Sequence, residues 1–344
     1  MAGAVALCHL GPISAKPTTA RVSSATAKIA PQVLIISMVR QWPIPIPRVH
    51  VDSPLTRRQF EPEAQVWHER LPSSGLGDLL AQNISTPGLS MLYPHVHCVA
   101  NGTVCQVTTG EGEINAAATL MALGLSDKFD LTKTYFLMAG IAGVNPKHAT
   151  LGGVALAHYA VQVALQYEFD AREMPEGFET GYFGYGTRGP GEYPLVAYGT
   201  EVFKVNEELR DRVYTYAQRA ALQDSEGAAA YRAKYKGVRG GGSDDVYAAG
   251  AGRPAVVKCD TATSDAYYSG TLLSEAFENI TLSWTNGTGK YCMTAQEDNA
   301  SLEVLVRLAI EGLVDFARVI VMRTGRFMPC QRAQPTGLRK EKKS

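Results

Sequence analysis

The sequence lacks several features that would place it in a simple class. Its longest apolar run, Tyr135–Val144, has ten residues, about half of the roughly 20 that a membrane-spanning helix needs. The six cysteines include no Cys-x-x-Cys pair, and no P-loop, GxSxG or zinc motif occurs. Lys+Arg and Asp+Glu balance at 33 each, so no overall basic field indicates a nucleic-acid partner. With 344 residues, 45% of them hydrophobic, the chain has room for a large folded domain.

Two stretches differ in composition from the rest. Residues 39–59 contain four prolines and carry a net charge of +3, and residues 326–344 carry +5, which leaves −8 elsewhere. Proline fixes φ and lacks an N–H, so neither helix nor sheet is expected through 39–59. Composition leaves two interpretations open: a surface insertion and a disordered tail, or a translated intron (Val codons begin with GT, and one Gln codon ends with AG) and a frameshifted end. Residues 1–30 are expected to be disordered or a vestigial targeting segment, because their apolar start has no basic flank.

Apolar periodicity elsewhere predicts alternating strands and helices. Buried-type strands are predicted at 33–38, 134–139, 255–259 and 317–322, helices at 114–125, 207–236, 264–279 and 298–311, and a hairpin at 97–105 around Asn101-Gly102. Alternation of this kind favours one α/β domain, 31–325 interrupted by 39–59, with a mostly parallel mixed sheet covered on both faces. Sites in such sheets lie beyond the carboxyl ends of strands. The candidate turns follow Met38, Thr109, Ala139, Cys259 and Arg323.

The cysteines and asparagines bear on the compartment. Cys98 and Cys105 flank the predicted hairpin turn, and Cys259 and Cys292 are the other pair in the body of the chain. Buried free thiols and two disulfides are both compatible with this spacing. Five of the eight asparagines lie in N-x-S/T sequons, namely Asn83, Asn101, Asn279, Asn286 and Asn299. That density favours two disulfides and an origin in the secretory pathway, or at the cell surface.

Four segments together carry a resemblance to a known family. They are Val107–Ala118 with Gly110-Glu111-Gly112, Leu131–Glu173 with Gly140-Ile141-Ala142-Gly143, Cys259–Gly270, and Tyr291–Ala300. Over about residues 31–38 and 60–325, the chain resembles the purine nucleoside permease (NUP) family, within the nucleoside phosphorylase/nucleosidase superfamily. The resemblance implies a three-layer α/β/α, nucleoside phosphorylase-like fold. It also implies a pocket for a purine nucleoside or purine base. No cofactor and no metal are expected in this pocket, and the resemblance is compatible with a homo-oligomer.

The resemblance also implies roles for individual residues. If Met38 joins directly to Phe60, Glu63 matches the glutamate that activates water in the nucleosidases. The expected substrate-binding residues are Gly110, Glu111, Gly140, Ile141, Gln296, Glu297, Asp298 and Asn299. Glu297 is the first choice for holding the sugar hydroxyls, and its alternative role is to complement a helix dipole. Ser264 and Asp265 are expected to support the pocket wall.

Two departures from the superfamily pattern favour water over phosphate as the nucleophile. Met138 stands where phosphorylases have an arginine, and Ile141 replaces a hydroxyl residue. A glutamate at the phosphate position would also repel the anion. A third departure concerns activity, since Arg326-Phe327 follow Met322–Gly325 where the family has Ser-Asp-Phe-Asp. Three functions therefore stay open: hydrolysis of the N-glycosidic bond, nucleoside transport as the family name says, and binding without catalysis.

Overall fold

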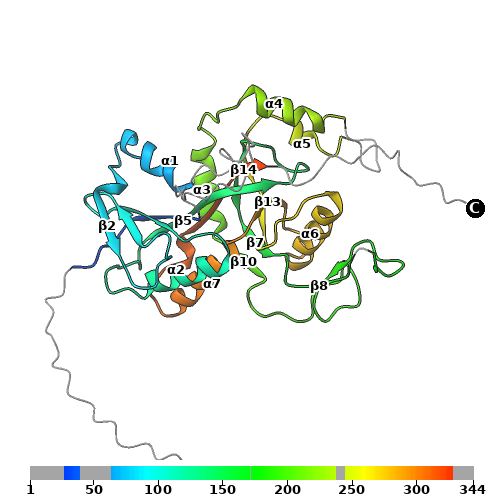
Figure 1. Ribbon diagram of the computed structural model, residues 1–344, viewed down its shortest axis with the longest axis horizontal. Helices are drawn as coiled ribbons and strands as arrows, with labels where there is room; N and C mark the ends of the chain where they lie inside the picture. Colours follow the sequence, from blue (N-terminus) through cyan, green and yellow to red (C-terminus); the bar gives the residue numbers. More distant parts are fainter. Residues whose placement is uncertain (1–26, 39–62, 171, 238–244, 328–344) are drawn as a thin grey trace, which may run out of the picture.

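The computed structural model describes residues 27–38, 63–170, 172–237 and 245–327 (Figure 1). The predicted insertion at 39–59, and all of the tail beyond residue 327, lie outside these residues. The strands are β1 (Val33–Ser37), β2 (Gln82–Ser85), β3 (His95–Cys98), β4 (Val104–Thr108), β5 (Tyr135–Val144), β6 (Val154–Ala157), β7 (Tyr159–Gln162), β8 (Tyr167–Glu168), β9 (Tyr182–Phe183), β10 (Val202–Lys204), β11 (Val256–Lys258), β12 (Asp260–Thr263), β13 (Tyr291–Ala295) and β14 (Val319–Phe327). The helices are α1 (Glu63–Arg70), α2 (Glu113–Gly124), α3 (Glu207–Ala217), α4 (Glu226–Arg232), α5 (Ala248–Ala251), α6 (Thr271–Trp284) and α7 (Asp298–Ile310), with short 3-10 helices η1 (Pro72–Ser74), η2 (Leu79–Ala81), η3 (Ala233–Tyr235) and η4 (Phe316–Arg318).

Twelve of the strands form one mixed sheet. Its main path runs β10-β7-β12-β13-β5-β1-β4-β3-β2, and β14, β6 and β11 are joined to it through β5. Most pairs at its centre are parallel: β1 with β4 and β5, β14 with β5, and β12 with β13 and β7. The contact between β13 and β5 is antiparallel. Antiparallel hairpins and edge strands extend this centre on both sides. The prediction of a mostly parallel mixed sheet in an α/β domain is confirmed.

Helices cover both faces of the sheet, and β1 shows why the sequence requires this. Successive side chains of a strand point to opposite faces. Leu34 and Ile36 are buried in the core that α2 and α7 cover, whereas Ile35 packs against Leu71 and Trp67 on the α1 side. Burial of each such aliphatic side chain stabilises the fold by about 1.5–3 kcal/mol. Figure 1 shows α2 and α7 together on one side of the sheet, with α1 on the other.

Two strands run further than predicted. The apolar pattern indicated that the strand at 134–139 ends before Gly140, but β5 continues to Val144. Likewise β14 continues through Arg323 to Phe327. Each extension is stabilised by the other, since β5 and β14 pair in parallel along their length with Arg323 opposite Gly140. Long-range pairing of this kind overrides the local signal of Gly140 and Gly143, which favoured a turn.

Two helix predictions need correction. The stretch predicted as one helix at 207–236 contains α3 and α4, because Ser225 caps a new helix by accepting a hydrogen bond from Ala228 N. The helix predicted at 264–279 begins only at Thr271, after Gly270 with φ of 105°. Among the described residues, no helix is long and apolar enough to cross a membrane.

The structure contains two disulfides. Cys98 and Cys105 lie opposite each other in the β3–β4 hairpin and are bonded across it. Cys259, between β11 and β12, is bonded to Cys292 in β13. Of the two alternatives that the spacing left open, the described residues therefore adopt the disulfide-bonded one.

Candidate functional site

Glu63 bridges the carboxyl-terminal parts of two central strands. It is the first residue of α1, where the helix dipole favours a carboxylate. Its Oε2 accepts a hydrogen bond from the backbone N–H of Met38, at the end of β1, at 2.7 Å. Its Oε1 accepts one from the N–H of Ile141 in β5 at 2.6 Å. These two donors stabilise the negative charge of a carboxylate that is only 7% exposed.

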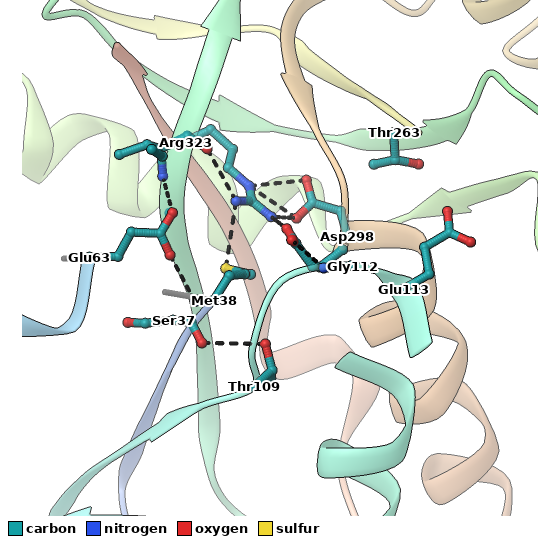
Figure 2. A network of polar contacts seen from close by, with 12 residues as sticks. Ser37, Met38, Glu63, Thr109, Gly112, Glu113, Thr263, Asp298 and Arg323 are labelled. Carbon is teal, nitrogen blue, oxygen red and sulfur yellow. Dashed lines mark hydrogen bonds and ion pairs between the residues drawn. The ribbon is translucent and has the colours of Figure 1, made fainter. Parts of the chain in front are cut away.

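Arg323 places a buried positive charge beside Glu63. Its side chain, 1% exposed, extends from β14, and its guanidinium donates three hydrogen bonds to the carboxylate of Asp298, two from Nε and one from Nη2. Its Nη1 also donates to the carbonyl of Ile141 at 3.4 Å. Figure 2 shows Glu63 and Asp298 on opposite sides of this guanidinium. A buried cation of this kind is tolerated because carboxylates pair with it.

Gly140 makes room for this arrangement. It lies opposite Arg323 in the β5–β14 pair, and side chains in register on parallel strands share a face. A Cβ atom at Gly140 would lie 2.8 Å from Glu63 Oε1 and would also contact the Arg323 guanidinium. The glycine in this strand is therefore required by close packing.

Glu297 faces the same guanidinium from the amino-terminal end of α7. Its Oε2 lies 3.6 Å from Arg323 Nη2, and its Oε1 accepts a hydrogen bond from the N–H of Gly112 at 3.0 Å. Gly112 is the N-cap residue of α2 and has no side chain with which to satisfy the free N–H groups there. Glu297 supplies one carboxylate to this helix end, and Asp265 Oδ1 accepts from the next N–H, that of Glu113, at 3.0 Å.

One cavity collects the side chains of these elements. Its lining residues are Met38, Glu63, Glu111, Ile141, Ala142, Ala266, Tyr267, Tyr268, Thr294, Gln296, Glu297 and Arg323. Three carboxyl groups and one guanidinium therefore face it, and that guanidinium is already paired with Asp298 behind the wall. Aromatic and aliphatic groups, with the polar side chains of Thr294 and Gln296, supply the remaining surface, which suits a flat, weakly polar ligand with hydroxyl groups.

The acidic groups shift one another's protonation. Burial raises the pKa of Glu297 to about 7 from an ordinary value of 4.5; Arg323 and the Gly112 N–H oppose the rise, and Glu63 and Asp298 add to it. Burial also raises the pKa of Tyr267, with further contributions from Glu111, Glu297 and Glu63. Burial would lower the pKa of Arg323, but Asp298 and Glu297 outweigh it and raise the pKa. Acidic groups thus outnumber basic groups among the residues that line the cavity.

A family model describes most of the chain. The model for the purine nucleoside permease (NUP) family matches residues 30–334. The chain belongs to this family. A purine nucleoside permease of Candida albicans is 51% identical over 70% of this chain and 58% of its own length, so this chain covers less than two thirds of that relative. A probable purine nucleoside permease of Schizosaccharomyces pombe is 42% identical over 77% of this chain and 74% of its own length.

Solved structures resemble the chain only distantly. A 5'-methylthioadenosine/S-adenosylhomocysteine nucleosidase of Helicobacter pylori, in complex with butyl-thio-DADMe-Immucillin-A, is 12% identical, with a TM-score of 0.47 and 89% of each chain covered. A futalosine hydrolase mutant of Helicobacter pylori is 12% identical with a TM-score of 0.43, covering 86% of this chain and 89% of its own.

The predicted residues of this NUP-family chain fall into two groups. Glu63, Glu111, Ile141, Gln296 and Glu297 line the cavity. The others lie in its walls or behind them. Gly110 forms the turn after β4 with φ of 91°, and Gly140 packs behind Glu63.

The remaining predicted residues have local partners. The Asp298 carboxylate is taken up by Arg323, and Asn299 accepts a hydrogen bond from Thr263 Oγ1 at 2.6 Å. Ser264 Oγ accepts one from the N–H of Ala266 at 3.0 Å and so supports the turn that carries Tyr267. Asp265 accepts a hydrogen bond from the N–H of Glu113 at the amino-terminal end of α2. The described residues contain no cluster of His, Cys, Asp or Glu suited to hold a metal ion.

Sequence reasoning did not assign a role to Arg323 or Tyr267. The signal for Arg323 was present, because it is the first charged residue after an apolar stretch of strand from Val319 to Met322. A charge in a strand of buried type must be paired, so a carboxylate partner could have been expected. Tyr267 is part of the conspicuous Thr263–Tyr268 segment, but its place at the cavity depends on where the turn after β12 points.

Proposed function

We propose that this chain binds a purine nucleoside in the cavity between Glu63 and Glu297 and hydrolyses its N-glycosidic bond. Membership of the purine nucleoside permease family supports the ligand class. The observation that carries the reaction is the placement of Glu63. A carboxylate held by two backbone N–H groups faces a cavity that a second carboxyl group lines from the opposite side.

In this mechanism the bond between the sugar C1′ and the purine nitrogen breaks through an oxocarbenium-like state. Each carboxylate oxygen of Glu63 retains a lone pair beyond the one used by its N–H donor, so Glu63 can accept a proton from an attacking water. Glu297 holds the sugar hydroxyls. The leaving purine takes a proton as the bond to C1′ breaks, and Glu297, whose pKa is raised to about 7, is a donor among the groups that line the cavity.

The charge of the cavity favours water over phosphate. Three carboxyl groups face a single guanidinium, and that guanidinium already donates to Asp298. Phosphate would have to approach these carboxylates without a free cation among the lining residues, and like charges repel strongly in a partly buried site. Met138, fully buried in the core, offers no phosphate contact either.

The test is an assay for free base. Purified protein is incubated with inosine or adenosine, with and without phosphate, and the products are separated by chromatography. We expect base and free sugar at the same rate in both conditions. Release that requires phosphate and yields a sugar phosphate would show phosphorolysis, and binding without release would show a binder.

A second candidate is a role in nucleoside transport, which the names of the relatives favour. Capture of nucleosides at this cavity and delivery across a membrane would use Glu297 and Tyr267 for binding without bond cleavage. Uptake of a nucleoside labelled in both base and sugar distinguishes the two functions. Transport brings both labels into the cell together, whereas extracellular hydrolysis separates them.

A further inference from the structure

The sequons of the chain lie in very different surroundings. Asn299 is 2% exposed, and both ends of its amide are used. Its Oδ1 accepts from Thr263 Oγ1, and its Nδ2 donates to the carbonyls of Thr200 at 2.7 Å and Glu201 at 3.1 Å. A glycan on this nitrogen would replace one of the two hydrogens that it donates, and it could not fit in the core. Asn299 therefore supplies an internal reference for an unmodified sequon.

Asn101 has the opposite surroundings. It is exposed at the tip of the β3–β4 hairpin. Its Oδ1 accepts hydrogen bonds from the N–H of Thr103 at 3.1 Å and from its Oγ1 at 2.7 Å. The hydroxyl of the sequon thus bonds the amide of its own asparagine, and within the described part of the chain Asn101 Nδ2 donates to no acceptor. This nitrogen is directed to solvent.

Asn286 is another accessible sequon. It is exposed in the turn between α6 and β13 and adopts the left-handed region with φ of 52°, followed by Gly287. No side-chain hydrogen bond from Asn286 occurs among the residues that the structure describes. Neither Asn101 nor Asn286 lines the cavity, so substituents on them leave the site described above open.

These two exposed sequons lie close to disulfides in the chain. Asn101 lies between the bonded Cys98 and Cys105, and Asn286 shortly precedes Cys292, which is bonded to Cys259. Disulfides form and persist in the compartments of the secretory pathway, where N-glycosylation also occurs. The two kinds of observation are independent and point to the same compartment.

We propose that Asn101 and Asn286 are N-glycosylation sites, and that Asn299 is not. The co-reactant is an oligosaccharide joined to a lipid pyrophosphate. The Asn Nδ2 forms a bond to the anomeric carbon of the first N-acetylglucosamine, while the bond from that carbon to the pyrophosphate oxygen breaks. The lipid pyrophosphate leaves with the electron pair, and one amide proton passes to a base.

The experiment uses the full chain behind a cleavable secretory leader in yeast, which ensures entry into the endoplasmic reticulum. The secreted protein is treated with peptide N-glycosidase in heavy-oxygen water, which converts each glycosylated Asn to labelled Asp, and its peptides are analysed by mass spectrometry. We expect label at positions 101 and 286 and none at position 299. Unlabelled Asn at both 101 and 286 in disulfide-bonded protein would overturn the proposal.

Matched variants assign the glycans to their sites. Asn101→Gln and Asn286→Gln should each lower the apparent mass on a gel by the mass of one glycan. The double variant should lower it by the mass of two. Thr103→Ser preserves the sequon and should keep the glycan at Asn101. Non-reducing gels check that each variant forms its disulfides, so loss of a glycan is not confused with misfolding. Label at position 299 in folded, disulfide-bonded protein would also contradict the proposal.

Discussion

The two sides of the cavity hold their carboxyl groups in different ways. On the α1 side, Glu63 is held by the N–H groups of Met38, directly after β1, and of Ile141 in the neighbouring strand β5. On the α7 side, Glu297 has one backbone donor, and burial raises its pKa to about 7. Pairs of carboxyl groups in unlike environments are a recurring basis for dividing tasks in glycoside hydrolysis. The proposed function uses this difference by giving the proton-accepting task to Glu63 and hydroxyl binding to Glu297.

Removal of Arg323 should have the largest effect, because this residue connects the two sides. In Arg323→Met, Asp298 becomes a buried charge without its partner, and Glu297 loses its nearby cation. We expect a loss of about 3–5 kcal/mol in the free energy of unfolding, measured by urea denaturation. The double variant Arg323→Met/Asp298→Asn, which also removes the unpaired charge, should recover part of this loss in the free energy of unfolding.

Arg318 provides the matched control. It lies in η4, just before the same strand, and pairs with Asp315 at 3.0 Å with a third of its side chain exposed. A surface pair of this kind contributes about 0–1 kcal/mol, so Arg318→Met should unfold nearly as the wild type does. Equal losses in the two variants would show that burial of Arg323 does not set its importance.

Substitution of Glu63 should separate activity from stability. Glu63→Gln keeps the size of the side chain but removes the charge that accepts a proton. We expect the rate of base release to fall by about 10²–10⁴-fold, with cooperative unfolding retained. Glu69→Gln, an exposed position on the same helix, should leave the rate unchanged. A wild-type rate in Glu63→Gln would exclude this residue as the base and would weaken the contrast between the two sides.

Local signals predicted most of the architecture. The apolar runs of β1, β5 and β14 identify strands in any context, and Asn101-Gly102 identifies the hairpin that its disulfide closes. The ends of β5 and β14 could not be predicted, because the glycines there favour a turn until the two strands pair. Pairing is also what brings Arg323 to Glu63, two residues separated by most of the chain. Individual residues of the site were therefore predictable, but the pairing of Arg323 with Asp298 and Glu297 was not.

The smallest predicted effect, apart from that of the Arg318→Met control, is a pH dependence that comes from Glu297. Its pKa is raised to about 7 in the folded state from 4.5, so the folded protein retains a proton that the unfolded chain releases between these values. The contribution of Glu297 to the free energy of unfolding is thus greatest below pH 4.5, falls as the pH rises towards 7, and stays constant above pH 7. The full change is about 3 kcal/mol. Urea denaturation at a series of pH values should show Glu297→Gln losing less stability than the wild type between pH 4.5 and 7. Burial also raises the pKa of Glu113, but this contribution is the same in the wild type and in Glu297→Gln. Parallel curves of stability against pH for the two proteins would show that the pH dependence does not come from Glu297, and the contrast in protonation between the two sides of the cavity would be lost.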